Sequence, residues 1–199
     1  FITPHSSPKK PWKQSVLIYT GEPEVFEEEK LLMENLDRRT RITETTSEFY
    51  RIIVQLTLTF GSQDYGGSGV LIGPHHVLTC GHNVYKNKKW ANNITIQPAL
   101  NEGCSPFGKA KAIKSYTFNQ WVEHGDSKYD MALLVLDHSI GKYTGWGSLL
   151  CLEDEELSQQ KVNITGYPGD KKFNQMWGMS NTMKTITDEK FYYEIDTFG

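Results

Sequence analysis

Six short stretches with the apolar pattern of β-strands lie between residues 52 and 136, and turn residues separate them. In the first, from Ile52 to Phe60, apolar side chains alternate with polar ones, as in a strand with one buried face. The last, from Met131 to Leu136, is apolar throughout, as in a strand buried on both faces. The other four lie at residues 70–72, 77–79, 92–98 and 109–118. Short strands at this spacing, with no alternating helices between them, predict an all-β fold with a closed antiparallel barrel.

The strand at residues 77–79 leads directly to a histidine. A Gly-Pro turn precedes this strand, and Cys80 and Gly81 connect it to His82. A histidine is the side chain best suited to act as a general base near neutral pH. His82 is therefore the first candidate catalytic residue.

Asp130 is the second candidate, because it stands immediately before the apolar stretch that begins at Met131. That stretch draws the carboxylate toward the interior, where an unpaired charge is costly and one bonded to an imidazole is satisfied. Taken alone, Asp130 could also be a polar residue that starts a strand or lies in a surface turn. With His82 upstream, we expect Asp130 to orient the imidazole and stabilise its charged form.

Several segments resemble a known family. The stretch GGSGVLIGPHHVLTCGH, ending at His82, resembles the histidine motif of chymotrypsin-like serine proteases, and most closely that of the glutamyl endopeptidases. ITGYPGDK at residues 164–171, followed by Met-Trp, is similar to that branch specifically. RTRITETT at residues 39–46 resembles the start of the mature enzymes, and YYEIDTFG at residues 192–199 resembles the lead-in to their Gly-x-Ser-Gly-Ser motif. The resemblance covers roughly residues 38–199.

The resemblance implies a serine endopeptidase that cleaves after Glu, or after Asp, with a Ser-His-Asp triad. His82 and Asp130 match two members, and the serine is expected just beyond Gly199 together with the oxyanion-hole donors. These 199 residues alone are therefore expected to be inactive. Ser68, in the sequence GGSGV, superficially echoes a serine motif, but the family places this position in the strand before the histidine, so we reject it as the nucleophile.

The implied fold is a chymotrypsin-like double antiparallel β-barrel, with the first barrel complete and the second incomplete. Strands are expected at residues 161–167, 182–187 and 191–195, and three strands are too few to close a barrel. We divide the chain into an N-terminal extension or propeptide at residues 1–36, a first barrel carrying His82 and Asp130 at residues 37–140, and the start of a second barrel at residues 141–199. Within the extension, residues 16–19 could form a short strand and residues 24–36 have helical spacing.

The three cysteines, at positions 80, 104 and 151, are an odd number, so they are not expected to form a framework of disulfides. Cys80 is expected to be buried with its strand and Cys104 to lie in a loop, and a cysteine hydrolase is only a minor alternative. His75 and His76 are adjacent, so in a strand their side chains point to opposite faces, which is poor spacing for a metal site. No cofactor or metal is expected.

The net charge of −3 gives no reason to expect a nucleic-acid or membrane partner, and no apolar run approaches the roughly 20 residues of a membrane span. The expected partner is a peptide or protein substrate. A non-catalytic protein of the same fold, whose second barrel is completed by a partner chain, remains the alternative. Secretion is expected from the resemblance, although unpaired cysteines and the lack of a visible signal peptide also allow an intracellular protein.

Overall fold

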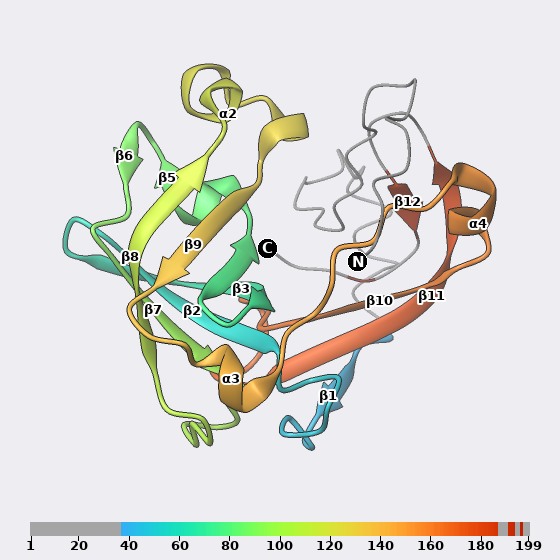
Figure 1. Cartoon of the computed structure of the whole chain (residues 1–199), viewed down its shortest axis with the longest axis horizontal. Coiled ribbons are helices and arrows are strands. Elements are labelled where there is room, and N and C mark those ends of the chain that lie inside the picture. Colours follow the sequence, from blue (N-terminus) through green and yellow to red (C-terminus); the bar gives the residue numbers. More distant parts are fainter. Residues whose placement is uncertain (1–36, 187–190, 194–195, 197–199) are drawn as a thin grey trace, which may run out of the picture.

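The computed structural model describes residues 37–186, 191–193 and 196, and it consists mainly of antiparallel strands (Figure 1). Six of them close a barrel in the order β2-β3-β4-β9-β8-β7. These strands are β2 (Ile53–Phe60), β3 (Gln63–Gly73), β4 (His76–Thr79), β7 (Asn93–Pro98), β8 (Ala110–Thr117) and β9 (Ala132–Leu136). The predicted all-β fold with a closed first barrel is thus confirmed. The strand expected at residues 16–19 and the helix at residues 24–36 lie outside the described residues.

Each of the six strands contributes buried aliphatic side chains to the barrel interior. The contribution of β8 is a single buried alanine. The buried cluster of the barrel contains Val54, Leu56, Leu58, Leu71, Val77, Val84, Ile94, Ile96, Ala110, Ala132, Leu134, Leu136 and Ile140. Burying a side chain of the size of leucine or valine contributes about 1.5–3 kcal/mol, so this cluster supplies the main driving force for closing the barrel. The alternation seen in β2 is therefore the pattern of a strand whose alternate side chains enter this core.

The hairpin of β2 and β3 is longer than its apolar pattern suggests. β3 begins at Gln63, and its first four residues are exposed although they pair with β2. Backbone hydrogen bonds hold these four residues in the hairpin, and such bonds do not require hydrophobic side chains, so the sequence pattern does not reveal them. Gly61 forms the turn with a φ of 65°, in the left-handed region that favours glycine.

A second, four-stranded sheet contains β1 (Thr40–Ile42), β10 (Lys161–Gly166), β11 (Met176–Ile186) and β12 (Phe191–Tyr193). β11 is central to it and pairs with each of the other three strands. In the part of the chain that the structure describes, this sheet stays open, as expected for the start of a second barrel. β1 belongs to it although its residues fall in the range assigned to the first barrel, so the chain passes from this sheet to the barrel between β1 and β2 (Figure 1).

Short helices and hairpins connect the strands. They are η1 (Gly81–Asn83), β5 (Tyr85–Lys86), β6 (Lys89–Trp90), α2 (Asn119–His124), η2 (Ser127–Tyr129), α3 (Gly141–Thr144) and α4 (Asp154–Ser158). The acidic stretch before residue 160 forms α4. Three acidic residues in the first turn favour its N-terminus, and Leu157 is buried. No helix among the described residues has both the length and the apolar character needed to cross a membrane.

The barrel and the second sheet are joined by a small core around Tyr167. The Tyr167 hydroxyl donates a hydrogen bond to the carbonyl of Leu100 at 3.0 Å, and its backbone N–H donates to Ser68 Oγ at 2.8 Å. Tyr167 packs with Leu100 and Met176, all of them buried. Burial raises the pKa of the Tyr167 hydroxyl, which therefore stays neutral and keeps donating. These contacts hold the second sheet, whose strand β10 leads into Tyr167, against the barrel.

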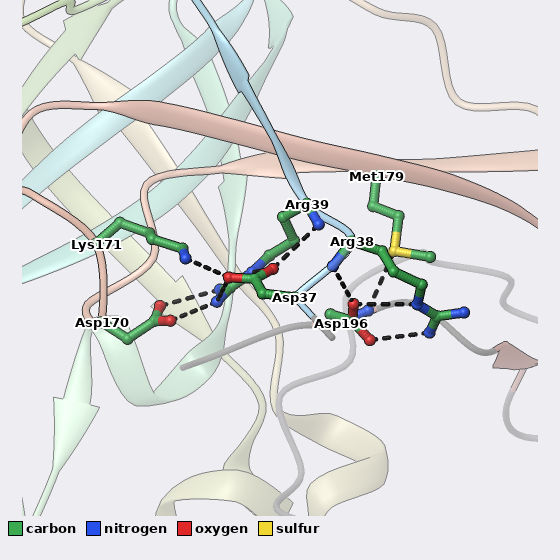
Figure 2. Close-up of polar contacts among 7 residues, drawn as sticks. All are labelled: Asp37, Arg38, Arg39, Asp170, Lys171, Met179 and Asp196. Carbon is green, nitrogen blue, oxygen red and sulfur yellow. Dashed lines mark hydrogen bonds and ion pairs between the residues drawn. The ribbon is translucent and has the colours of Figure 1, made fainter. Parts of the chain in front are cut away.

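Charged side chains anchor the segment that enters β1 (Figure 2). Arg39 lies between two carboxylates, with Nε 2.9 Å from Asp37 Oδ1 and Nη1 2.9 Å from Asp170 Oδ1. Lys171 also bonds to Asp37. Because the hydrogen bond from Arg39 stabilises the ionised form, the pKa of Asp37 lies well below its usual range. The bonds to Asp37 therefore stabilise the folded protein at pH values above about 3.9, the ordinary pKa of aspartate. This stabilisation is lost as the pH falls and the carboxylate becomes protonated.

We expect Arg39→Ala to lower the free energy of unfolding by about 1–3 kcal/mol, because it leaves two carboxylates without their shared donor. Arg38→Ala is the matched control. The side chain of Arg38 is 47% exposed and its guanidinium pairs with Asp196. Loss of this pair should lower the free energy of unfolding by at most about 1 kcal/mol. Urea unfolding at neutral pH measures both. Equal effects of the two substitutions would contradict the assigned role of Arg39.

Candidate active site

The pairing of β4 with β9 brings His82 and Asp130 together. Thr79, the last residue of β4, lies opposite Ala132, the first residue of β9. His82 follows Thr79 by three positions, in η1, and Asp130 precedes Ala132 by two. Antiparallel pairing places such flanking residues at the same end of the barrel, although 48 positions separate them in the sequence.

Asp130 contacts His82 with both carboxylate oxygens. Oδ2 lies 2.8 Å from the imidazole Nδ1, and Oδ1 accepts the backbone N–H of His82 at 2.7 Å. The Asp130 side chain is 10% exposed and that of His82 is 29% exposed. A carboxylate can only accept, so Nδ1 carries the proton, and the neutral ring keeps a lone pair on Nε2. The arrangement therefore presents a base whose orientation and tautomer are both held by one carboxylate.

Gly81 allows this close approach. A Cβ atom at this position would lie 3.0 Å from Asp130 Oδ1, 2.8 Å from Trp121 Cδ1 and 3.0 Å from Thr117 Oγ1. Trp121 is itself held by a hydrogen bond from Nε1 to the carbonyl of Tyr85 at 3.1 Å. Sequence reasoning did not identify Trp121 or Thr117 as neighbours of the pair. No local pattern marks them, because they come from α2 and from the end of β8.

Ser68 lies in β3, ahead of His82, as the resemblance implies. Its hydroxyl accepts the N–H of Tyr167 at 2.8 Å, and its carbonyl accepts Thr79 Oγ1 at 2.8 Å. Gly166 also packs closely on it, since a Cβ there would lie 2.6 Å from Ser68 Oγ. These contacts give Ser68 a structural role in joining β3 to β4 and to the second sheet.

The cysteines occupy different environments. Cys104 and Cys151 are exposed, whereas Cys80 is 3% exposed and directly follows β4. Burial of Cys80 and a loop position for Cys104 are therefore confirmed. The structure also gathers a set that sequence reasoning missed: one ligand atom from each of Cys80, His82 and Asp130 lies within 4.8 Å of the other two. The third member, Asp130, lies 48 positions after His82 in the sequence, so no short sequence spacing marks the set.

The chain is similar in sequence to several known proteins. A sequence model for the trypsin family matches residues 43–191. An extracellular metalloprotease of Bacillus subtilis is 32% identical over 194 residues, covering 94% of this chain and 62% of its own length. A glutamyl endopeptidase of Bacillus licheniformis is 32% identical over 165 residues, covering 82% of this chain and 50% of its own length. The chain thus spans about half to three fifths of these curated relatives.

Solved structures show the same similarity in three dimensions. A Glu endopeptidase in complex with MPD aligns with a TM-score of 0.72 at 31% identity, over 81% of this chain and 75% of that one. The protease Anisep of Arthrobacter nicotinovorans aligns with a TM-score of 0.59 at 23% identity, over 68% of this chain and 65% of that one, which shows the fold alone.

Proposed function

The chain belongs to the trypsin family and is a homologue of the glutamyl endopeptidases, and from this premise we propose that it supplies the base and the orienting carboxylate of a serine endopeptidase. The observation that carries the proposal is the contact of His82 Nδ1 with Asp130 Oδ2 at 2.8 Å. It leaves Nε2 as the acceptor that a hydroxyl nucleophile needs. The nucleophilic serine is proposed to lie beyond Gly199, because residues 192–199 resemble the lead-in to the serine motif of the glutamyl endopeptidases.

In the proposed reaction, Nε2 of His82 takes the serine proton as the serine oxygen bonds to the carbonyl carbon of the substrate. The imidazolium then gives this proton to the leaving amine, and the carbon–nitrogen bond breaks. Water attacks the acyl-enzyme by the same route, with His82 again as base. Asp130 stays ionised throughout and stabilises the imidazolium. Backbone donors near the serine would stabilise the oxyanion, which is worth about 3–4 kcal/mol per donor.

Cleavage after Glu, or after Asp, is the proposed specificity, and its support is the printed activity of the glutamyl endopeptidase relatives. A role outside the cell is also proposed, because the relative from Bacillus subtilis is described as extracellular. The 199 residues alone are proposed to be inactive.

The test uses the complete protein with peptides that differ only in the residue before the scissile bond. Hydrolysis after Glu, with covalent labelling by a fluorophosphonate, supports the full proposal. Hydrolysis only after Lys removes the specificity and leaves the mechanism. Neither labelling nor hydrolysis would favour the alternative function, a non-catalytic protein whose second barrel is completed by a partner chain.

We also expect residues 1–36 to be removed from the active protein. The ion pairs of Asp37, Arg38 and Arg39 hold the segment that enters β1 in place, and their partners Asp170 and Asp196 lie later in the chain, so removal of residues 1–36 leaves these ion pairs intact. N-terminal sequencing of the active protein should locate the new terminus near these residues. Full activity with Phe1 still attached would contradict this expectation.

A further inference from the structure

Three different metal-ligating groups meet at the proposed base. Cys80 follows β4, His82 lies in η1, and Asp130 precedes β9, with one ligand atom of each within 4.8 Å of the others. Thiolate, imidazole and carboxylate are the three side-chain ligands that zinc uses in proteins. A serine protease needs the imidazole and the carboxylate, but its mechanism gives no role to the thiol.

We propose that Cys80, His82 and Asp130 form an inhibitory zinc site that shuts off the base. The inhibitory consequence rests on the proposed protease function, whereas the binding of zinc does not. Zinc bonds to sulfur at about 2.3 Å and to nitrogen or oxygen at about 2.0–2.2 Å, so its ligand atoms lie about 3–4 Å apart. The ligand atoms of the cluster lie within 4.8 Å of one another, and Nδ1 and Oδ2 are 2.8 Å apart. Zinc binding therefore needs the sulfur to move closer and the nitrogen and oxygen to separate slightly.

The burial of the three groups suits a bound cation. Cys80 and Asp130 are 3% and 10% exposed, and the more open His82 gives the ion its path of entry. A thiolate and a carboxylate together carry two negative charges, which balance those of the ion. A neutral site costs far less to bury than an isolated charge. Water completes the tetrahedron on the open side.

Binding changes the tautomer of His82. The thiol of Cys80 loses its proton to solvent as the zinc–sulfur bond forms. The Nδ1 proton, which had been hydrogen-bonded to Asp130, also leaves to solvent, Nε2 takes up a proton from solvent, and zinc binds the lone pair of Nδ1. The neutral imidazole then carries its proton on Nε2. That nitrogen can no longer accept the serine proton, so the ion blocks hydrolysis without occupying the substrate site.

Cobalt tests the binding independently of activity, because a thiolate bonded to Co²⁺ gives a charge-transfer band in the near ultraviolet. The test adds CoCl₂ to the complete protein carrying Cys104→Ser and Cys151→Ser, which removes the exposed thiols. We expect a band that saturates at one ion per chain and that ZnCl₂ displaces. Adding Cys80→Ala to this background should abolish the band while circular dichroism stays unchanged, and Cys80→Ser provides a second variant if alanine perturbs folding. No band in the double variant, or a band that survives loss of Cys80, would overturn the site.

Inhibition is then measured with ZnCl₂ against peptide hydrolysis, each variant being compared with its own metal-free rate. Loss of Cys80 should raise the zinc concentration for half-inhibition by more than about tenfold. A saturating band with undiminished hydrolysis would overturn the inhibitory role. If the complete protein hydrolyses no peptide, the proposed function fails, and the cobalt band still decides whether the site exists.

Discussion

Replacing His82 by alanine in the complete protein is expected to lower kcat for peptide hydrolysis by about ten-thousand-fold or more. The variant removes the atom that would accept the serine proton and later return it to the leaving amine. KM should change little, because the imidazole acts on the reacting atoms and not on substrate affinity. The fold should persist, since His82 is partly exposed and its backbone N–H can still bond to Asp130 Oδ1.

His124→Ala is the matched control for this experiment. His124 ends α2, and its side chain is 71% exposed beside Glu123. Its loss should leave kcat unchanged. Stopped-assay rates with a Glu-containing peptide, and urea unfolding of both variants, separate chemistry from stability. Undiminished hydrolysis by the His82 variant would rule out the mechanism, whatever the specificity.

Asp130→Asn should cost about ten-thousand-fold in kcat, although it changes a single atom. One oxygen can still accept the backbone N–H of His82, which leaves the amide –NH₂ facing Nδ1. That group donates, so Nδ1 must accept and the ring proton moves to Nε2. The base is then in the wrong tautomer, as we also propose for the zinc-bound form.

Asp137→Asn is the control, because Asp137 lies just beyond the other end of β9 (Ala132–Leu136). Asp137 accepts the backbone N–H of Lys111 at 3.0 Å, and this bond holds the pKa of its carboxyl below the usual range. The control should therefore lose a little stability at neutral pH and keep its kcat. Comparing kcat of the two variants decides the point: equal rates would show that Asp130 does not set the tautomer.

The strands of the barrel could be located from the sequence wherever their side chains enter the core. β2 and β9 were predicted to within a residue or two, because alternation or continuous apolar character follows directly from burial. The first half of β3 and the start of β11 were missed. Their exposed or mixed side chains are held in the sheets by backbone hydrogen bonds, which any residue except proline can make.

The sequence by itself determined the candidate pair, because His82 and Asp130 each adjoin a strand with a clear local pattern. Only the tertiary structure decided that they touch, that Cys80 joins them, and that Trp121 and Thr117 enclose Gly81 beside them. It alone also placed Arg39 between Asp37 and Asp170, 131 positions from the latter. The physical reason is that local patterns report burial along one segment, whereas contacts between distant segments depend on strand pairing and sheet packing.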